Sequence, residues 1–197
     1  MENPVTKARL ILASASPRRR ELLDQIGVTY RGIISEIDES ALADEKPGDY
    51  VCRMARAKAR DVKQREGSDT PVLGADTAVV IDGRILGKPV NRAHAMEMLQ
   101  DLSGRTHEVW SAVALVLAGS RILERLNVTR VTFSQMDRQW IEAYCDSGDP
   151  MDKAGAYGVQ GMAAQKISLL QGSYSGVMGL PVYETAELLK DFGIMLL

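Results

Sequence analysis

A short segment near the N-terminus combines hydroxyl groups with arginines where a predicted strand meets a predicted helix. The apolar run Leu10–Ala13 leads through Ser14 and Ser16 to Pro17, which suits the first helical position because its missing N–H needs no partner there. Arg18 to Arg20 follow, although the helix dipole disfavours a cation in the first turn by about 0.3–1 kcal/mol. Free N–H groups, hydroxyls and guanidiniums together predict a polyanion site. The alternative is a solvated basic helix start.

A carboxylate interrupts an otherwise apolar strand in the middle of the first half of the chain. The segment Val72–Ile81 is apolar around Asp76 and Thr77. A buried carboxylate costs several kcal/mol unless it is paired or binds a metal. Gly74, together with the alanine after it, is expected to leave room for a close ligand. The pattern predicts chemistry at Asp76, and the alternative is a structural aspartate that bonds to a neighbouring backbone group.

A glycine-rich segment, Asp152–Gly161, carries little apolar bulk, so packing does not explain it. Its backbone can approach a ligand closely, and Lys153 and Gln160 supply a charge and an amide. The segment therefore predicts ligand contact, with an ordinary surface loop as the alternative. Lys58 and Lys88 indicate nothing by themselves, because lysines on helices and in turns are usually solvated.

Composition narrows the class of protein. The chain has 197 residues, of which 45% are hydrophobic, and this predicts one domain or two closely joined lobes. A net charge of −2 argues against a nucleic-acid polymer as partner. Cys52 and Cys145 form no disulfide framework or zinc pattern, which is typical of a reducing compartment. No apolar run is long enough to span a bilayer, and Met1 to Arg9 lack a signal core. We expect a soluble cytoplasmic protein without a membrane partner.

These candidate residues need a framework of alternating strands and helices. An acidic loop, Ser35–Gly48, is expected to precede a helix capped by Asp49, and Asp82-Gly83 is typical of a hairpin turn. The pattern predicts an α/β fold with a mixed twisted sheet and flanking helices. We expect strands at 9–13, 30–34, 71–81, 84–86, 109–117, 122–133 and 165–170, and helices at 17–26, 49–66, 92–102, 137–145 and 182–192.

Five motifs, standing in order, resemble those of the Maf family of nucleoside triphosphate pyrophosphatases. The resemblance runs from about Leu10 to Phe192 and implies a single Maf-like domain over residues 1–197, with two lobes around a cleft and a fold related to inosine triphosphate pyrophosphatases. It also implies a divalent cation, Mg²⁺ or Mn²⁺, and hydrolysis of a nucleoside triphosphate to the monophosphate and pyrophosphate. The motifs are Ser14–Arg19, Gly74–Thr77, Gly87–Pro89, Asp152–Gly161 and Gly179–Pro181.

Within the family, the chain is similar to the dTTP/UTP pyrophosphatase branch at Arg18, Thr77 and Gln160, which the resemblance marks as specificity residues. Modified pyrimidine nucleotides belong to the same expected substrate class. The branch acting on 7-methyl-GTP carries tryptophan, glutamine and glutamate at these positions. A glutamine amide can pair with O4 and N3–H of uracil or thymine. Because neighbouring side chains of a strand point to opposite faces, we expect Thr77 to point away from Asp76 and to contribute less to base discrimination than Gln160 and Arg18.

The remaining roles come from the resemblance. Asp76 matches the proton acceptor, and the acidic pair Asp38 and Glu39 matches residues that help to hold the cation, although the acidic loop offers other carboxylates. A nucleotide-binding regulator of septum formation or cell division with weak hydrolysis is the alternative function. Whether two chains pair as a homodimer stays open. The residues that match phosphate ligands are Ser14, Arg19, Lys58, Lys88 and Lys153.

Overall fold

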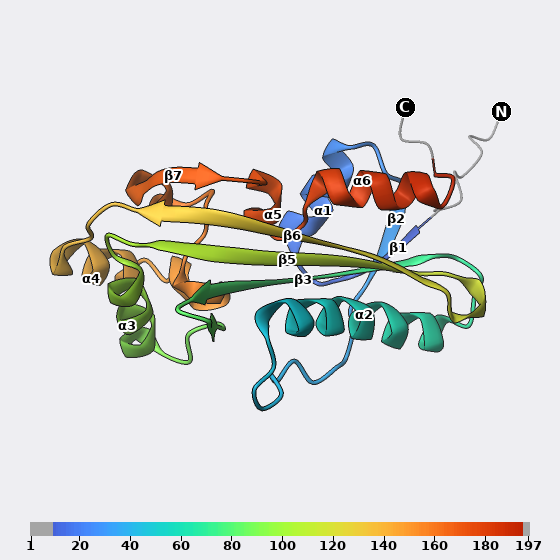
Figure 1. Cartoon of the computed structure of the whole chain (residues 1–197), viewed down its shortest axis with the longest axis horizontal. Coiled ribbons are helices and arrows are strands. Elements are labelled where there is room, and N and C mark those ends of the chain that lie inside the picture. Colours follow the sequence, from blue (N-terminus) through green and yellow to red (C-terminus); the bar gives the residue numbers. More distant parts are fainter. Residues whose placement is uncertain (1–9, 195–197) are drawn as a thin grey trace.

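The computed structural model describes residues 10–194, and it shows a seven-stranded mixed sheet with helices on both sides (Figure 1). The strand order is β2-β1-β3-β5-β6-β7, with β4 paired to β3. β1 is parallel to β2 and β3, and the other pairs are antiparallel. The α/β prediction is therefore confirmed. The strands are β1 (Leu10–Ala13), β2 (Tyr30–Ile33), β3 (Val72–Ile81), β4 (Arg84–Leu86), β5 (Thr106–Val116), β6 (Ile122–Phe133) and β7 (Ile167–Gln171).

The helices divide between the two faces of the sheet. α2 runs along one face, against β3 and β5, while α5 and α6 lie on the other face, against β5 and β6 (Figure 1). Among the described residues, no helix is long and apolar enough to cross a membrane. The helices are α1 (Pro17–Gln25), α2 (Pro47–Glu66), α3 (Arg92–Leu102), α4 (Arg138–Asp146), α5 (Tyr174–Met178) and α6 (Val182–Asp191).

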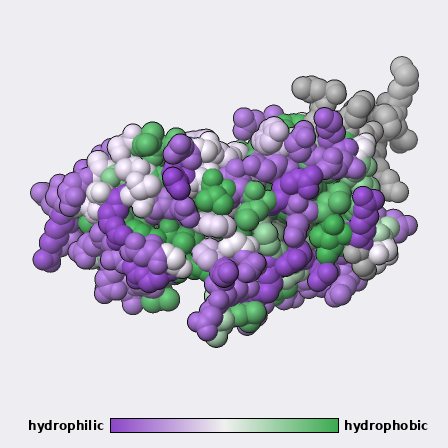
Figure 2. Space-filling view, in the orientation of Figure 1, coloured by the Kyte–Doolittle hydropathy of each residue, from purple (hydrophilic) through white to green (hydrophobic). Residues whose placement is uncertain are grey.

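Two separate apolar cores lie at opposite ends of the long strands β3, β5 and β6, and we call each end with its core a lobe. One core, around Phe133 and Leu99, packs α3 and α4 against one end of the sheet. The other, around Leu23 and Leu188, packs α1 and α6 near β1. In space-filling view the surface is hollowed between the lobe that carries α3 and the loop before α2 (Figure 2).

One edge of β3 is open where the two lobes meet. β1 pairs with β3 only at Val72 and Leu73, and β4 pairs with it only from Val79 onward. In the described part of the chain, residues 74–78 of β3 thus have a strand partner, β5, on one side only. Side chains from both faces of β3 can reach the space beside this edge. Ligands of α/β sheets commonly bind outside the carboxyl ends of strands, and β1 ends beside this space.

The predicted elements need few changes. α2 begins at Pro47, so Asp49 is not the cap but lies in the first turn, where the helix dipole favours a carboxylate. β5 begins at Thr106 instead of 109, and a 3₁₀ turn over Met162–Lys166 delays β7 to Ile167. The short helix α5 was not predicted, and Arg9 of the first predicted strand lies outside the described residues.

Candidate active site

A cavity of about 600 Å³ lies beside the open edge of β3 and brings together residues from both lobes. Its volume is in the range of small-molecule sites. The start of α1, the acidic loop, β3 and the glycine-rich segment each contribute to its walls. Every residue to which the family resemblance gives a role lines this cavity, with the exception of Asp38. These lining residues are Ser14, Arg18, Arg19, Glu39, Lys58, Asp76, Thr77, Lys88, Lys153 and Gln160.

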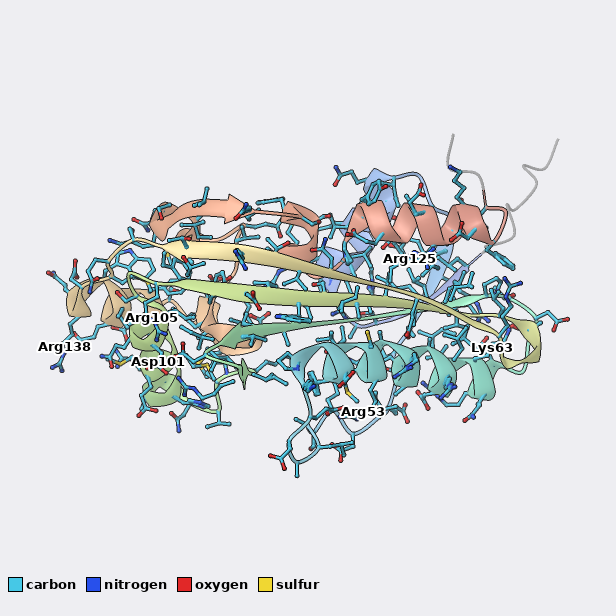
Figure 3. The ribbon with its side chains drawn as sticks, viewed as in Figure 1. Arg53, Lys63, Asp101, Arg105, Arg125 and Arg138 are labelled. Atoms are coloured by element: carbon cyan, nitrogen blue, oxygen red, sulfur yellow. The ribbon has the colours of Figure 1, made fainter. Side chains whose placement is uncertain are left out.

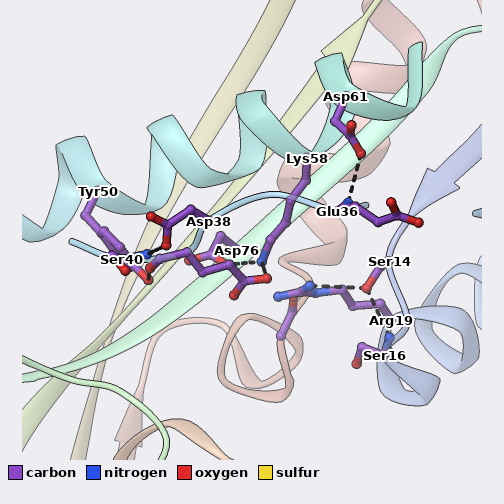
Figure 4. A network of polar contacts seen from close by, with 12 residues as sticks. Ser14, Ser16, Arg19, Glu36, Asp38, Ser40, Tyr50, Lys58, Asp61 and Asp76 are labelled. Atoms are coloured by element: carbon purple, nitrogen blue, oxygen red, sulfur yellow. Dashed lines mark hydrogen bonds and ion pairs between the residues drawn. The ribbon is translucent and has the colours of Figure 1, made fainter. Parts of the chain in front are cut away.

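Asp76 is 5% exposed and is held by a lysine from α2. Lys58 Nζ lies 2.7 Å from Asp76 Oδ1 and 3.0 Å from Glu39 Oε1, so one ammonium group links both carboxylates (Figure 4). Gly74 makes this possible: a Cβ at that position would lie 2.2 Å from the carbonyl oxygen of Ala55 in α2. The expectation that Gly74 leaves room for a ligand is therefore wrong, because the helix backbone takes that room and thereby places Lys58 on Asp76.

The charge state of Asp76 follows from burial and from its cationic neighbours. Burial raises the pKa of Asp76, while the positive charges of Lys58 and Arg19 act in the opposite direction. A carboxylate whose pKa is above the ordinary value accepts a proton more readily, which suits a general base. Asp76 is thus buried beside the cavity, with the cationic groups of Lys58 and Arg19 as its neighbours.

The acidic loop is fastened to α2, and this fixes the position of Glu39. Arg53 donates from Nε and Nη2 to the carboxylate of Glu45, and the guanidinium lowers the pKa of Glu45 to about 2 (Figure 3). Tyr50 donates its hydroxyl to the carbonyl of Glu39 at 3.0 Å. Asp38 instead accepts the N–H of Ser40 at 2.9 Å and stays exposed, outside the cavity (Figure 4). Glu39 therefore lines the cavity and Asp38 does not, and the metal role of both stays a prediction.

The start of α1 places an arginine and a serine opposite Asp76. Arg19 donates from Nε to the carbonyl of Gly179 at 2.8 Å and from Nη1 to Ser14 Oγ at 3.2 Å (Figure 4). The hydroxyl of Ser16 makes no capping bond, although Ser16 precedes Pro17 as predicted. A guanidinium has five N–H donors, so Arg19 keeps donors for an anion in the cavity.

The glycine-rich segment forms the far wall and encloses a second pocket of about 220 Å³, which Arg18 and Gln160 line. Gln160 is exposed, and Arg18 lies 3.8 Å from Asp152 as a loose ion pair. Tyr157 closes the pocket from the apolar side, where its hydroxyl lies 2.7 Å from Nε2 of His107. Burial lowers the pKa of His107 to about 4, so this imidazole is neutral at pH 7.

The predicted phosphate-binding lysines differ in how their charges are used. The ammonium of Lys153 donates to Asp152 Oδ1 at 2.6 Å, to Asp149 Oδ1 at 3.0 Å and to the carbonyl of Asp149. All three of its donors are therefore occupied within the protein, and its phosphate role stays a prediction. Lys58 has two carboxylate partners, whereas Lys88 is exposed at the rim of the cavity.

A comparison with known proteins matches residues 9–192 to a family described as Maf-like protein. The chain belongs to the Maf family. A curated relative from Alkalilimnicola ehrlichii, named dTTP/UTP pyrophosphatase, is 50% identical and covers 97% of this chain and 96% of its own. Another of that name, from Escherichia coli O157:H7, is 49% identical and covers 94% of each chain. A solved structure described as a nucleoside-triphosphatase / dITP/XTP pyrophosphatase, from Mycobacterium abscessus, has a TM-score of 0.43 at 19% identity, over 63% of this chain and 73% of that one.

Residues 9–192, which match the Maf family, include every residue that lines the cavity. They also include residues near the site that the sequence analysis did not single out. Thr77 Oγ1 lies 2.8 Å from the hydroxyl of Ser111 in β5, on the face opposite Lys58, so the predicted opposite orientation of Asp76 and Thr77 is confirmed. Both residues still line one cavity, because the edge of β3 is open there. Ser111, Tyr157 and His107 were missed. The sequence hint for Ser111 was a lone hydroxyl in the apolar run of β5.

The donor set of this Maf cavity fits a hard divalent cation that is shared with a substrate. Mg²⁺ usually takes one or two protein carboxylates and completes its coordination with water and phosphate oxygens. Glu39 and Asp76 supply two carboxylates, and both lie within 3.0 Å of Lys58 Nζ, so a cation would bind beside this ammonium and not in its place. No group of three or more His, Cys, Asp or Glu side chains that could hold a metal ion gathers anywhere among residues 10–194, this cavity included. The fit therefore depends on phosphate oxygens as the remaining ligands.

Proposed function

We propose that this chain is a nucleoside triphosphate pyrophosphatase that hydrolyses dTTP and UTP, and related modified pyrimidine nucleotides, to the monophosphate and pyrophosphate. The observation that carries the proposal is Asp76, a buried carboxylate with a raised pKa that faces a cavity of nucleotide size among cationic groups. The relatives named dTTP/UTP pyrophosphatase support it, since they cover nearly the whole chain at about half identity. The chain acts as one domain, with a lobe on each side of the substrate.

In this mechanism Asp76 accepts a proton from the water that attacks the α-phosphorus. The bond between the α-phosphorus and its bridging oxygen breaks, and pyrophosphate leaves with the bonding electron pair. Arg19 and the exposed Lys88 hold the phosphate oxygens, and Lys58 keeps Asp76 in place. Mg²⁺ or Mn²⁺, when bound by Glu39 and Asp76 together with the phosphates, supplies charge neutralisation in the transition state.

The second pocket is the proposed binding site of the pyrimidine base. The Gln160 amide is exposed at its mouth, and it pairs with O4 and N3–H of uracil or thymine. Arg18 lines the same pocket and donates to O4, which disfavours the N4 donor of cytosine. Such a site rejects mismatched bases because buried polar groups would be left unpaired.

The proposed cellular setting is the cytoplasm. Cys52 and Cys145 are free thiols, which agrees with the reducing conditions of the cytoplasm. The cavity is bounded by both lobes and has the volume for one small molecule, so the proposed partner is a nucleotide monomer and not a nucleic-acid polymer.

The test is a panel of nucleoside triphosphates assayed with Mg²⁺ or Mn²⁺, with pyrophosphate and orthophosphate measured separately. We expect dTTP and UTP to give pyrophosphate and the monophosphate in equal amounts. Release of orthophosphate and a diphosphate would refute the proposed bond cleavage. Binding of dTTP without turnover would favour a nucleotide-binding regulator, a function that needs no carboxylate at Asp76.

A further inference from the structure

Ser111 connects the cavity to the backbone on the far side of the sheet. Its side chain is completely buried in β5, and its hydroxyl lies 2.6 Å from the carbonyl oxygen of Gly176 in α5. The same hydroxyl lies 2.8 Å from Oγ1 of Thr77. Thr77 is half-buried and lines the cavity, so the chain of contacts ends where a substrate would bind.

The direction of these two hydrogen bonds follows from counting protons. A carbonyl oxygen only accepts, so the single hydroxyl proton of Ser111 must point to Gly176. Ser111 Oγ then has only lone pairs to offer, so Thr77 must donate its own single proton to Ser111. The oxygen of Thr77 is left with a lone pair and no proton for a group in the cavity.

We propose that Ser111 is a positioning residue that makes Thr77 an acceptor-only contact, and that Thr77 accepts a hydrogen bond from the 3′-hydroxyl of the substrate sugar. The proposal rests on the proposed function for the substrate class. Ionised phosphate oxygens only accept, so they cannot be the partner of this oxygen. The donors of dTTP and UTP are the sugar hydroxyls and the N3–H of the base.

The position of Thr77 favours the sugar. Thr77 follows Asp76 directly along β3, and its side chain reaches the cavity from the opposite face of the strand. A Cβ placed on Gly179 would lie 4.0 Å from Thr77 Oγ1 and 3.7 Å from Nε of Arg19, which puts Thr77 near the phosphate end. Thr77 shares the main cavity with Gln160, but it does not line the smaller pocket of Arg18 and Gln160 in which the base is proposed to bind.

The experiment compares substrates that can donate a hydrogen bond with analogues that cannot. We would measure kcat/KM for dTTP and for 3′-fluoro-3′-deoxythymidine triphosphate, whose fluorine has no proton, in wild type, Ser111→Ala and Thr77→Val. Wild type should prefer dTTP by about 2- to 10-fold, the range of one neutral hydrogen bond. Thr77→Val removes the acceptor and should bring the ratio close to one. Ser111→Ala leaves the Thr77 hydroxyl free to turn and to donate as well as accept, so the ratio should fall part of the way toward one.

A matched control and a second pair of substrates complete the design. Thr185→Val removes another buried hydroxyl that donates to a carbonyl, in α6, and should leave the ratio unchanged. If Ser111→Ala changes the UTP to CTP ratio but not the dTTP to fluoro-analogue ratio, the donor is the base N3–H and the sugar assignment is overturned. Equal loss on all substrates in both Ser111→Ala and Thr77→Val would show a purely structural role. Wild type that fails to hydrolyse dTTP would instead refute the proposed function.

Discussion

The two ends of the cavity differ in how many of their polar groups are already bonded within the protein. Around Asp76, the carboxylate, Lys58 and Glu39 form one connected group, and Arg19 is fixed by Ser14 and Gly179. At the other end Gln160 is exposed, and Arg18 has one loose ion pair.

This difference separates two tasks of the site. Groups that stabilise a transition state work best when they are oriented before the reaction, because no reorganisation is then needed. Groups that read a base gain their partner only from the substrate, and they discriminate through what is left unpaired. We therefore expect substitutions at the Asp76 end to reduce turnover on every substrate, and substitutions at the Gln160 end to change the preference among substrates.

The largest effect is expected from Asp76→Asn. The amide cannot accept the proton of the attacking water, so kcat should fall by about 10²–10⁴-fold on dTTP and UTP alike. The control is Asp82→Asn, which removes an exposed carboxylate that pairs with Arg105 just after the end of the same strand. Asp82→Asn should keep normal turnover. Near-normal kcat in Asp76→Asn, with the fold intact by circular dichroism, would contradict the assignment.

A smaller effect is expected on the pH dependence of turnover. Asp76 must be deprotonated to act as a base, so kcat/KM should fall as the pH drops through its pKa, which burial places above the ordinary value of about 3.9. Lys58→Met removes the neighbouring charge that lowers this pKa most, so the acidic limb should move to higher pH. Lys63→Met is the control, because Lys63 is on the same helix but donates to backbone carbonyls. An acidic limb that is the same in wild type and Lys58→Met would argue against Asp76 as the titrating base.

The smallest effect on turnover, and the largest on selectivity, is expected from Gln160→Glu. The added charge repels O4 of uracil and thymine, so the preference for UTP and dTTP over CTP and 7-methyl-GTP should fall by roughly 10-fold. Gln100→Glu adds the same charge at an exposed position of α3, outside the cavity, and should leave the preference unchanged. A wild type that prefers 7-methyl-GTP would show that Gln160 has been misinterpreted. Uniform loss on all substrates in Gln160→Glu would remove the distinction between the two ends.

The amino-acid sequence was sufficient for the features that depend on neighbours along the chain. Leu10–Ala13 followed by Pro17 gave a strand and a helix start, and Asp82-Gly83 gave the hairpin between β3 and β4, because these patterns act over a few residues. The motifs also identified residues that line the cavity, from Ser14 to Gln160. A resemblance over the whole chain can assign residues that are far apart in the sequence to one site, whereas local spacing cannot.

Only the tertiary structure decided which of those side chains are bonded to one another. From its neighbours in the sequence, Gly74 was expected to make room for a ligand. In the structure, the backbone of α2 occupies the space that a Cβ at this position would need. The motifs placed Lys153 and Asp38 at the site, and the structure adds that Lys153 donates to Asp149 and Asp152 and that Asp38 accepts from Ser40. Their phosphate and metal roles stay predictions.

The physical reason is the range of the interactions. Strand and helix patterns follow from local backbone preferences and from burial of one face, which repeat with a fixed period in the sequence. The bonds that define the site join Lys58 to Asp76, Thr77 to Ser111 and Ser111 to Gly176, and these join different helices and strands, 18, 34 and 65 residues apart. The sequence by itself therefore determined which residues surround the cavity, and the packing of α2 and α5 on opposite faces of the sheet decided what each of them does there.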